Sequence, residues 1–462
     1  MTAPFFDLIL KNGKAATPGG IVEADIAIKD GKIASLGRFD QAAQVIDCQN
    51  LHILPGIIDS HVHFREPGLT YKEDLSTGTL SAILGGVTSI FEMPNTDPLT
   101  LTAADIADKL ARSENRAFCD YAFYVGGCAE NTHLLASIET MPGCAGIKVF
   151  MGSSTGALLA ARDAEIEAIF KQGTRRVALH AEDEFRLIER KQIVEKSRRV
   201  QDHPVWRDAQ TALIATTRAV ALAHKTNRPI HLLHVTTADE MAFLQDHKDI
   251  ATIETTPQHL TLFSPDCYDR LSTLAQMNPP IRDKSHQEAL WQAIANGLID
   301  TLGSDHAPHT RDEKAKPYPQ SPSGMTGVQT LLPVMLTHVA AGKLSLLRLV
   351  DLLCAGPQRV YGIRGKGRIA VGSDADFAIV DLNKKWTIRN SQMASKSGWT
   401  PFDGFAARGF VTGTILRGRV MQWEGEVCES PKGIPVRFFS TAAHAPGCLP
   451  ESTITRPTAA CC

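Results

Sequence analysis

The sequence predicts an α/β fold: a (β/α)8 TIM-type barrel joined to a small composite β-sandwich domain formed from both chain ends. In the middle of the chain, eight short apolar runs alternate with segments of helical spacing over roughly 250 residues. Short strand-like runs separated by glycine occupy both ends. The length of 462 residues is sufficient for one large barrel and one smaller unit.

The eight apolar runs are the predicted barrel strands. They are Gly56–His63, Val87–Met93, Tyr121–Val125, Gly146–Met151, Val177–Ala181, Pro229–Thr236, Ala251–Thr256 and Ile299–Ser304. Helical spacing of apolar residues between them is clear in Asp163–Phe170, Asp208–His224 and His286–Asn296. A doubly wound open sheet is the alternative, and it ranks lower because no Gly-x-Gly-x-x-Gly follows the first strand.

The ends of the chain are predicted to pair into one β domain, with the barrel inserted between its two parts. The expected strands are residues 7–11, 24–28 and 32–36 before the barrel, and Gly365–Ile369, Asp376–Val380, Gly413–Leu416 and Arg419–Trp423 after it. Two helices, Val328–Ala340 and Leu346–Leu353, precede the second group. The predicted boundaries are 1–54, 55–364 and 365–440, followed by a mobile tail at 441–462.

Composition excludes several classes of protein. A net charge of −2 indicates neither a nucleic-acid nor a membrane-surface partner, both of which need basic patches. No apolar run reaches the ~18 residues of a membrane span, and the N-terminus lacks the basic region of a signal peptide. The ten cysteines are scattered without a C-x-x-C pair, so structural disulfides are not expected. We therefore expect a cytoplasmic protein that acts on a small molecule.

Side chains that can bind metals recur where the predicted strands end. Active sites of such barrels lie at the C-terminal ends of the strands. The first strand ends in His61 and His63, which point the same way because they are two residues apart. The other strand-end residues of this kind are Lys148, His180, His234 and Asp305.

Each of these residues also has a purely structural interpretation. A lone buried histidine such as His180 is more often a hydrogen-bonded core residue than a ligand, and a lysine in an apolar run usually pairs with an acid. The joint placement at one end of successive strands favours a metal site with two cations. A buried ammonium beside cations would be repelled. We therefore hypothesise that Lys148 is carboxylated by CO2 and bridges the two metals; the alternative is a lysine paired with an acid outside the metal shell.

The ligands predict the chemistry. Two nearby cations lower the pKa of a shared water and polarise a carbonyl group. Nitrogen and oxygen donors without thiolate suit zinc, and manganese or cobalt could substitute. Asp305 would take the proton of the attacking hydroxide and deliver it to the departing nitrogen. The predicted reaction is hydrolysis of an amide, or its reverse.

Five motifs resemble the dihydroorotases of the amidohydrolase superfamily, in the lysine-bridged branch shared with hydantoinases. They are Asp59–Gly68, Glu92–Thr96, Gly146–Met151, Met277–Arg282 and Gly303–His309. The resemblance spans roughly residues 5–440. It implies reversible cyclisation of N-carbamoyl-L-aspartate to L-dihydroorotate in pyrimidine synthesis, and two zinc ions per subunit. It also implies a homo-oligomer, dimer or tetramer, and admits association with aspartate transcarbamoylase.

The resemblance assigns roles to matching positions. His61, His63 and Asp305 would hold one zinc, His180 and His234 the other, and carboxylated Lys148 would bridge them. The implied substrate contacts are Arg65, Asn95 and His309 for the carboxylate, and Asn278, Ser323 and Gly324 for the ring. A guanidinium is also, on physical grounds, the natural bidentate partner of a carboxylate.

Two other functions compete with this one. A hydantoinase or allantoinase would share the metal ligands but act on a ring without a carboxylate, and Arg65 argues against it. An inactive homologue that serves as a scaffold for aspartate transcarbamoylase would typically lose the first histidines, whereas His61 and His63 are both present. The sequence does not determine the conformation of the loop between Asp305 and Gly324.

Overall fold

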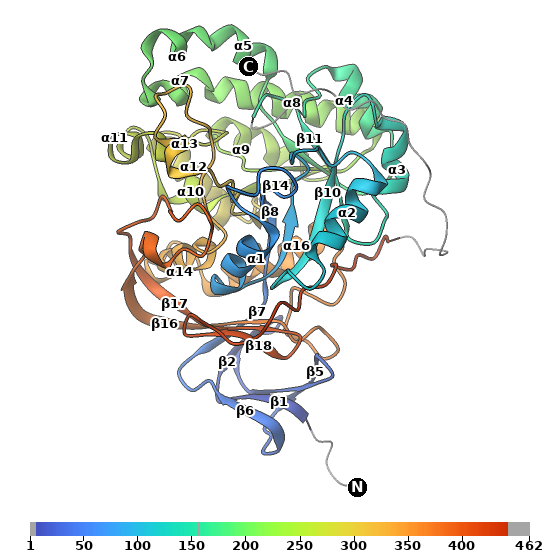
Figure 1. Cartoon of the computed structure of the whole chain (residues 1–462), viewed down its shortest axis with the longest axis vertical. Coiled ribbons are helices and arrows are strands. Elements are labelled where there is room, and N and C mark those ends of the chain that lie inside the picture. Colours follow the sequence, from blue (N-terminus) through green and yellow to red (C-terminus); the bar gives the residue numbers. More distant parts are fainter. Residues whose placement is uncertain (1–5, 155–157, 442–462) are drawn as a thin grey trace.

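Eight parallel strands form the barrel that the sequence predicts (Figure 1). The computed structural model describes residues 6–154 and 158–441. The barrel strands are β8 (Ile57–Val62), β9 (Val87–Glu92), β10 (Asp120–Gly126), β11 (Cys144–Phe150), β12 (Val177–His180), β13 (Ile230–Leu232), β14 (Ala251–Thr255) and β15 (Thr301–Leu302). They pair in sequence order, and a parallel bridge between Val62 and His306 connects the first strand to the segment after the last.

Helices surround the barrel, as is required to cover a parallel sheet. They are α1 (Leu75–Leu84), α2 (Ala103–Ser113), α3 (Leu135–Ile138), α4 (Asp163–Phe170), α5 (Glu184–Arg190), α6 (Gln192–Ser197), α7 (His203–Trp206), α8 (Ala209–Thr226), α9 (Ala238–Leu244), α10 (Pro257–Thr261), α11 (Asp266–Leu271), α12 (Lys284–Ala295), α13 (Arg311–Lys314), α14 (Leu331–Ala340), α15 (Leu346–Val350) and α16 (Gly356–Tyr361). Local signals set their ends: α8 begins where the Asp208 carboxylate accepts from the Thr211 backbone N–H, and it stops at Asn227 in a left-handed conformation. No helix in the described ranges is both long and apolar enough to cross a membrane.

Two barrel strands are shorter than predicted by four residues or more, and both changes concern the site. The segments Pro229–Thr236 and Ile299–Ser304 contribute only β13 and β15 to the sheet. The backbone turns away at His234 (φ +38°) and at Asp305 (φ +43°), in a conformation that residues other than glycine rarely adopt. Such strain persists where the surrounding structure imposes it, often at functional sites.

The β domain is a sandwich of two sheets. One sheet has the order β5 (Lys32–Gly37), β4 (Asp25–Lys29), β1 (Phe6–Lys11) and β6 (Ala42–Asp47). The other has the order β19 (Glu426–Val427), β18 (Arg419–Trp423), β17 (Ala406–Leu416), β16 (Phe377–Thr387), β7 (His52–Pro55), β2 (Lys14–Thr17) and β3 (Gly20–Glu23). Strands from the two chain ends meet where Ile53 of β7 pairs with Ile379 of β16. Leu10, Ile28 and Phe377 belong to one apolar cluster between the sheets, so the composite sandwich is confirmed.

The predicted strand Gly365–Ile369 is wrong. This segment is a loop in which Gly365 and Gly367 have positive φ. The cause is Lys366, whose buried ammonium lies 2.7 Å from Asp120 Oδ2 and also pairs with Asp376. The polar cluster therefore determines the path of the chain here. The domain boundaries remain predictions, and all of the predicted tail except residue 441 lies outside the described residues.

Replacing Lys366 with methionine is expected to lower the free energy of unfolding by about 3–5 kcal/mol, because Asp120 and Asp376 lose a buried counter-ion. Urea unfolding followed by circular dichroism measures the change. Lys32→Met is the matched control, since Lys32 pairs with Asp374 but is 41% exposed, and it should cost less than about 1 kcal/mol. Equal effects of the two variants would contradict the special role of Lys366.

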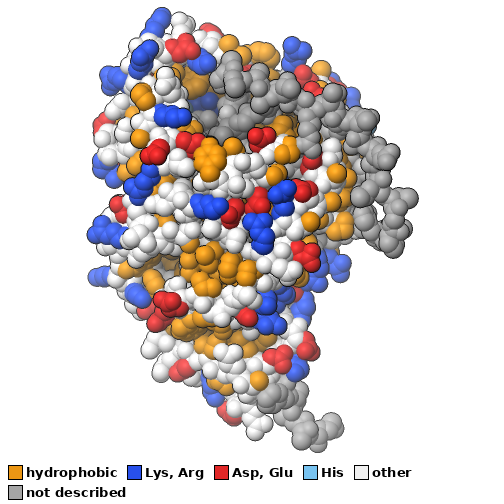
Figure 2. All heavy atoms as spheres, in the orientation of Figure 1, with side chains coloured by type: hydrophobic (Ala, Val, Ile, Leu, Met, Phe, Trp, Pro, Cys, Tyr) orange, Lys and Arg blue, Asp and Glu red, His pale blue; other side chains and the backbone are white. Residues whose placement is uncertain are grey.

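Acidic and basic side chains are interspersed over the described part of the face that Figure 2 shows. This distribution accords with the net charge of −2.

Candidate metal centre and substrate pocket

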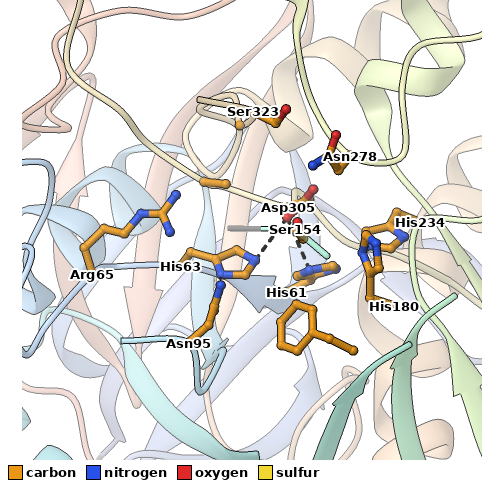
Figure 3. Close-up of a pocket in the computed structure, with 13 residues that line it drawn as sticks. His61, His63, Arg65, Asn95, Ser154, His180, His234, Asn278, Asp305 and Ser323 are labelled. Atoms are coloured by element: carbon orange, nitrogen blue, oxygen red, sulfur yellow. Dashed lines mark hydrogen bonds and ion pairs between the residues drawn. The ribbon is translucent and has the colours of Figure 1, made fainter. Parts of the chain in front are cut away.

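A pocket opens at the C-terminal ends of the barrel strands (Figure 3). Every predicted site residue lines it except Lys148 and His309. Phe150, Ser154 and Ala307 line it as well and were not predicted. The topology of a parallel barrel brings together residues as far apart in the sequence as His61 and Gly324, because all strand ends meet at one face.

His61, His63 and Asp305 form one group. Nε2 of His61 and Nε2 of His63 each lie 3.2 Å from Oδ1 of Asp305, and Figure 3 shows the two rings converging on this carboxylate. His61 is in β8, and His63 directly follows the end of this strand. The turn after β15 brings Asp305 close to both histidines. One ligand atom from each residue lies within 4.8 Å of the others, and all three side chains are buried. This group has the donors and the spacing to hold a divalent cation.

His180 and His234 form the second group. Nδ1 of His180 lies 3.0 Å from Nε2 of His234, and the two rings are nearly perpendicular. The rings of His61 and His234 are 5.2 Å apart, so the two groups adjoin. Burial and the neighbouring charges of His180 and His61 keep the pKa of His234 well below its usual value, so its ring is neutral and can act as a ligand.

Lys148 lies on β11 and is completely buried. Its Nζ has no hydrogen-bond partner among the described residues and lies 4.3 Å from the centre of the Phe150 ring. Burial lowers the pKa of Lys148 to about 7, although Asp305 and Glu254 oppose this. Its charge contributes to the lowered pKa of His180 and His234 and opposes the raised pKa of His61, which places it near both groups. The ion pair that was the alternative for this lysine is not formed within the described part of the chain.

Three polar side chains fix the orientation of the histidines. Oε1 of Glu254 lies 2.7 Å from His61 Nδ1, Oδ1 of Asn95 lies 2.8 Å from His63 Nδ1, and Oε2 of Glu182 lies 3.0 Å from His180 Nε2. An acceptor on one ring nitrogen places the proton there and leaves the other nitrogen with a lone pair directed into the pocket. The residues therefore fit a pair of divalent cations. Five donors converge, and each histidine ring of the first group has its tautomer set. The Lys148 amine, which has no hydrogen-bond partner among the described residues, lies near both groups.

Glu254 and Glu182 were missed by the sequence reasoning. Glu254 is the penultimate residue of β14 and is fully buried, with His61 and His231 lowering its pKa to about 2 although burial alone would raise it. Glu182 follows His180 by two residues, and Arg207 Nε lies 3.1 Å from both of its oxygens. The available signal was that Glu254 is a charged residue within the otherwise uncharged predicted strand Ala251–Thr256.

Arg65 lies on the side of the pocket away from His180 and His234 (Figure 3). Its guanidinium is buried, its Nε donates to the Pro308 carbonyl at 3.2 Å, and its Nη2 lies 3.3 Å from His309 Nε2. Burial, only partly offset by Asp305 and Glu92, lowers the pKa of Arg65 to about 10, so the group stays cationic at neutral pH. Among the residues that the structure describes, no carboxylate comes within the 4.0 Å of an ion pair with it.

The loop after Asp305 is held in place by Lys314. Its buried ammonium donates to three backbone carbonyls, those of Gln276 at 3.0 Å, Pro322 at 2.9 Å and Gly324 at 3.0 Å. Gly324 has φ +146°, and a Cβ there would lie 2.4 Å from the Ala307 carbonyl oxygen. Backbone therefore faces the pocket at this position without an intervening side chain.

Comparison with known proteins agrees with this geometry. Residues 52–421 match the model of the amidohydrolase family. A dihydroorotase of Methanothermobacter thermautotrophicus is 32% identical over 434 residues, which cover 92% of this chain and 96% of the relative. An allantoinase of Deinococcus radiodurans is 35% identical over 442 residues, covering 92% and 98%. The structure of an L-hydantoinase (dihydropyrimidinase) from Arthrobacter aurescens superimposes with a TM-score of 0.89 at 31% identity, covering 94% of this chain and all of the other. The barrel, the histidines at its strand ends and these similarities together place the chain in the amidohydrolase family.

Proposed function

We propose that this protein is a dihydroorotase, which interconverts L-dihydroorotate and N-carbamoyl-L-aspartate. The observation that carries this proposal is the buried guanidinium of Arg65 on the pocket wall, without an ion-pair partner among the described residues. Burying a charge is costly unless it is paired. An anionic substrate would supply the missing partner, and dihydroorotate carries a carboxylate on its ring.

The proposed binding mode follows from the positions of the polar groups. Arg65 offers the fork of donors that fits a carboxylate. Asn278, Ser323 and Gly324 line the same pocket and would face the ring. The scissile amide would then lie towards Asp305, between the two groups of histidines.

Two cations held by these residues would supply an activated water and a polarised amide carbonyl. We propose that Asp305 is the catalytic residue that moves the proton. Its carboxylate takes the proton of the attacking water and delivers it to the ring nitrogen as the C–N bond breaks. In the cyclisation direction it removes the proton from the carbamoyl nitrogen.

We also propose that Lys148 is carboxylated. In this step the neutral amine attacks the carbon of CO2, an N–C bond forms, and one proton leaves to solvent, which gives a carbamate anion. The absence of a hydrogen-bond partner for Nζ within the described residues, together with the adjacent histidine groups, supports this proposal. The anion would replace a buried amine that forms no ion pair within the described residues.

A cyclic amide hydrolase for uncharged rings is the second candidate. The 35% identity to an allantoinase and the superposition on an L-hydantoinase favour it. Purified zinc-loaded protein offered L-dihydroorotate, hydantoin, dihydrouracil and allantoin in parallel decides between the two. Turnover of dihydroorotate well above the other three supports our proposal, and preferred turnover of an uncharged ring overturns it.

Replacing Arg65 with methionine is expected to lower kcat/KM for dihydroorotate by roughly 10²-fold or more, because two charge-assisted hydrogen bonds are lost. Steady-state kinetics measures this, and metal analysis should show unchanged metal content. Arg311→Met, which removes an exposed arginine from the loop after Asp305, is the matched control. Unchanged turnover by Arg65→Met would refute the carboxylate role.

A further inference from the structure

His309 lies beside Arg65 and has polar groups at both ring nitrogens. Its Nδ1 lies 3.2 Å from the ammonium of Lys72, and its Nε2 lies 3.0 Å from the carbonyl oxygen of Ser323. The side chain is buried. Burial, together with the charges of Arg65 and Lys72, lowers the pKa of His309 to about 3 against the opposing effect of Glu313. The ring is therefore neutral at neutral pH, and it carries one proton on one of its nitrogens.

The neighbours of His309 determine which nitrogen is protonated. An ammonium can only donate a hydrogen bond and a carbonyl oxygen can only accept one. Nδ1 must therefore be the acceptor towards Lys72, and Nε2 must carry the proton that points to Ser323. Glu313 is the competing acceptor for Nδ1, but its Oε2 is 3.7 Å away, beyond hydrogen-bond distance.

Lys72 itself is firmly held. Its Nζ lies 2.9 Å from Glu313 Oε1, and the Tyr71 hydroxyl donates to the same oxygen at 2.9 Å. The other carboxylate oxygen of Glu313 accepts the backbone N–H of Thr310 at 3.0 Å, at the start of α13. Only 9% of the Lys72 side chain is exposed. Ordering a long lysine side chain costs conformational entropy. Its fixed position therefore indicates a specific role for Lys72.

A protonated Nε2 cannot accept a hydrogen bond from Arg65. Nη2 of Arg65 lies 3.3 Å from Nε2 of His309. When Nε2 donates its proton to the Ser323 carbonyl, it cannot accept from Arg65. The N–H of Arg65 Nη2 therefore stays available to an anion in the pocket. With the proton on Nδ1 instead, Nε2 would accept from Arg65 and occupy a donor that the anion needs.

We propose that Lys72, held by Glu313, is a positioning residue that fixes His309 in its Nε2–H tautomer, so that His309 donates to the Ser323 carbonyl and leaves the N–H groups of Arg65 to the substrate carboxylate. The inference rests on the proposed function and deepens it. It makes Lys72, which lies behind His309, a determinant of specificity for a ring that carries a carboxylate.

Binding of two probes to the zinc-loaded protein tests the inference. Orotate carries the ring carboxylate and uracil lacks it, and titration calorimetry measures both affinities. Lys72→Met should reduce the preference for orotate by about 10- to 100-fold, the effect of one hydrogen bond to a charged group. For dihydroorotate turnover the same variant should raise KM and leave kcat nearly unchanged. Lys72→Arg, which keeps a cationic donor at this position, should recover part of the preference.

Lys316→Met is the matched control, because Lys316 is an exposed lysine of the same loop, and it should bind both probes like the parent protein. A parent protein without preference for orotate would refute the proposed function and this inference with it. A preference that survives in Lys72→Met would refute the inference alone.

Nitrogen NMR of labelled histidine gives a readout that a merely structural role would not change. The signal of His309 is assigned by its loss in His309→Gln. We expect a protonated Nε2 and an unprotonated Nδ1 in the parent protein, and a shift towards protonated Nδ1 in Lys72→Met. A parent protein with the proton on Nδ1 would overturn the proposal.

Discussion

Replacing Asp305 with asparagine is expected to reduce kcat/KM for L-dihydroorotate by roughly 10³-fold or more, with the fold retained. Asparagine has the same shape, so its oxygen can still face His61 and His63, which lie 3.2 Å from Oδ1 in the parent protein. It cannot take up a proton, however. The loss should therefore appear in kcat, because Asp305 carries the one carboxylate among the described residues that line the pocket, and the departing nitrogen needs a proton.

Metal analysis and circular dichroism of the Asp305→Asn protein distinguish loss of chemistry from loss of the site. Asp312→Asn serves as the matched control, because Asp312 is an exposed carboxylate in the same loop and should keep full activity. A near-normal rate in Asp305→Asn would mean that another group moves the proton. Loss of metal from the variant would instead show that Asp305 is needed to bind the cation.

The barrel could be predicted because its strands are buried on both faces and read as apolar runs. The rule that active sites lie at the C-terminal strand ends then brought His61, His180 and His234 together without any knowledge of contacts. The sequence could not show that the chain leaves the sheet at Leu232 and Leu302, before His234 and Asp305. Those turns depend on left-handed backbone conformations that residues other than glycine adopt only when their surroundings impose them.

The residues that orient the ligands were beyond sequence reasoning for a different reason. Glu254 contacts His61 across 193 residues, and Lys72 contacts His309 across 237 residues. Neither pairing follows from spacing along the chain, since each depends on how the barrel closes and on how the loop after β15 folds back. The wrong strand at Gly365–Ile369 has the same origin, because its glycines serve a turn around the buried Lys366.

Lys148→Ala is expected to lose roughly 10³-fold or more in kcat/KM. The reason is that the proposed carbamate, which would help the two groups of histidines to hold the cations, is no longer present. Short carboxylic acids such as acetate or propionate should restore part of this activity, since the cavity left by the lysine side chain can accept an anion in the same place. The rescue should follow the acid concentration and saturate. Asp305→Asn, tested with the same acids, should not recover.

The carbamate itself can be observed separately from activity. Protein prepared with carbon-13 bicarbonate should give a carbamate carbon signal that is absent from Lys148→Ala. The physical reason to expect it is the position of Nζ, which is buried with no hydrogen-bond partner in the described ranges and lies close to both groups of histidines. A plain ammonium there would oppose binding of both cations, whereas a carbamate anion would favour it. Full metal content together with no carbamate signal would show that Lys148 stays an amine and that the cations need no bridge from β11.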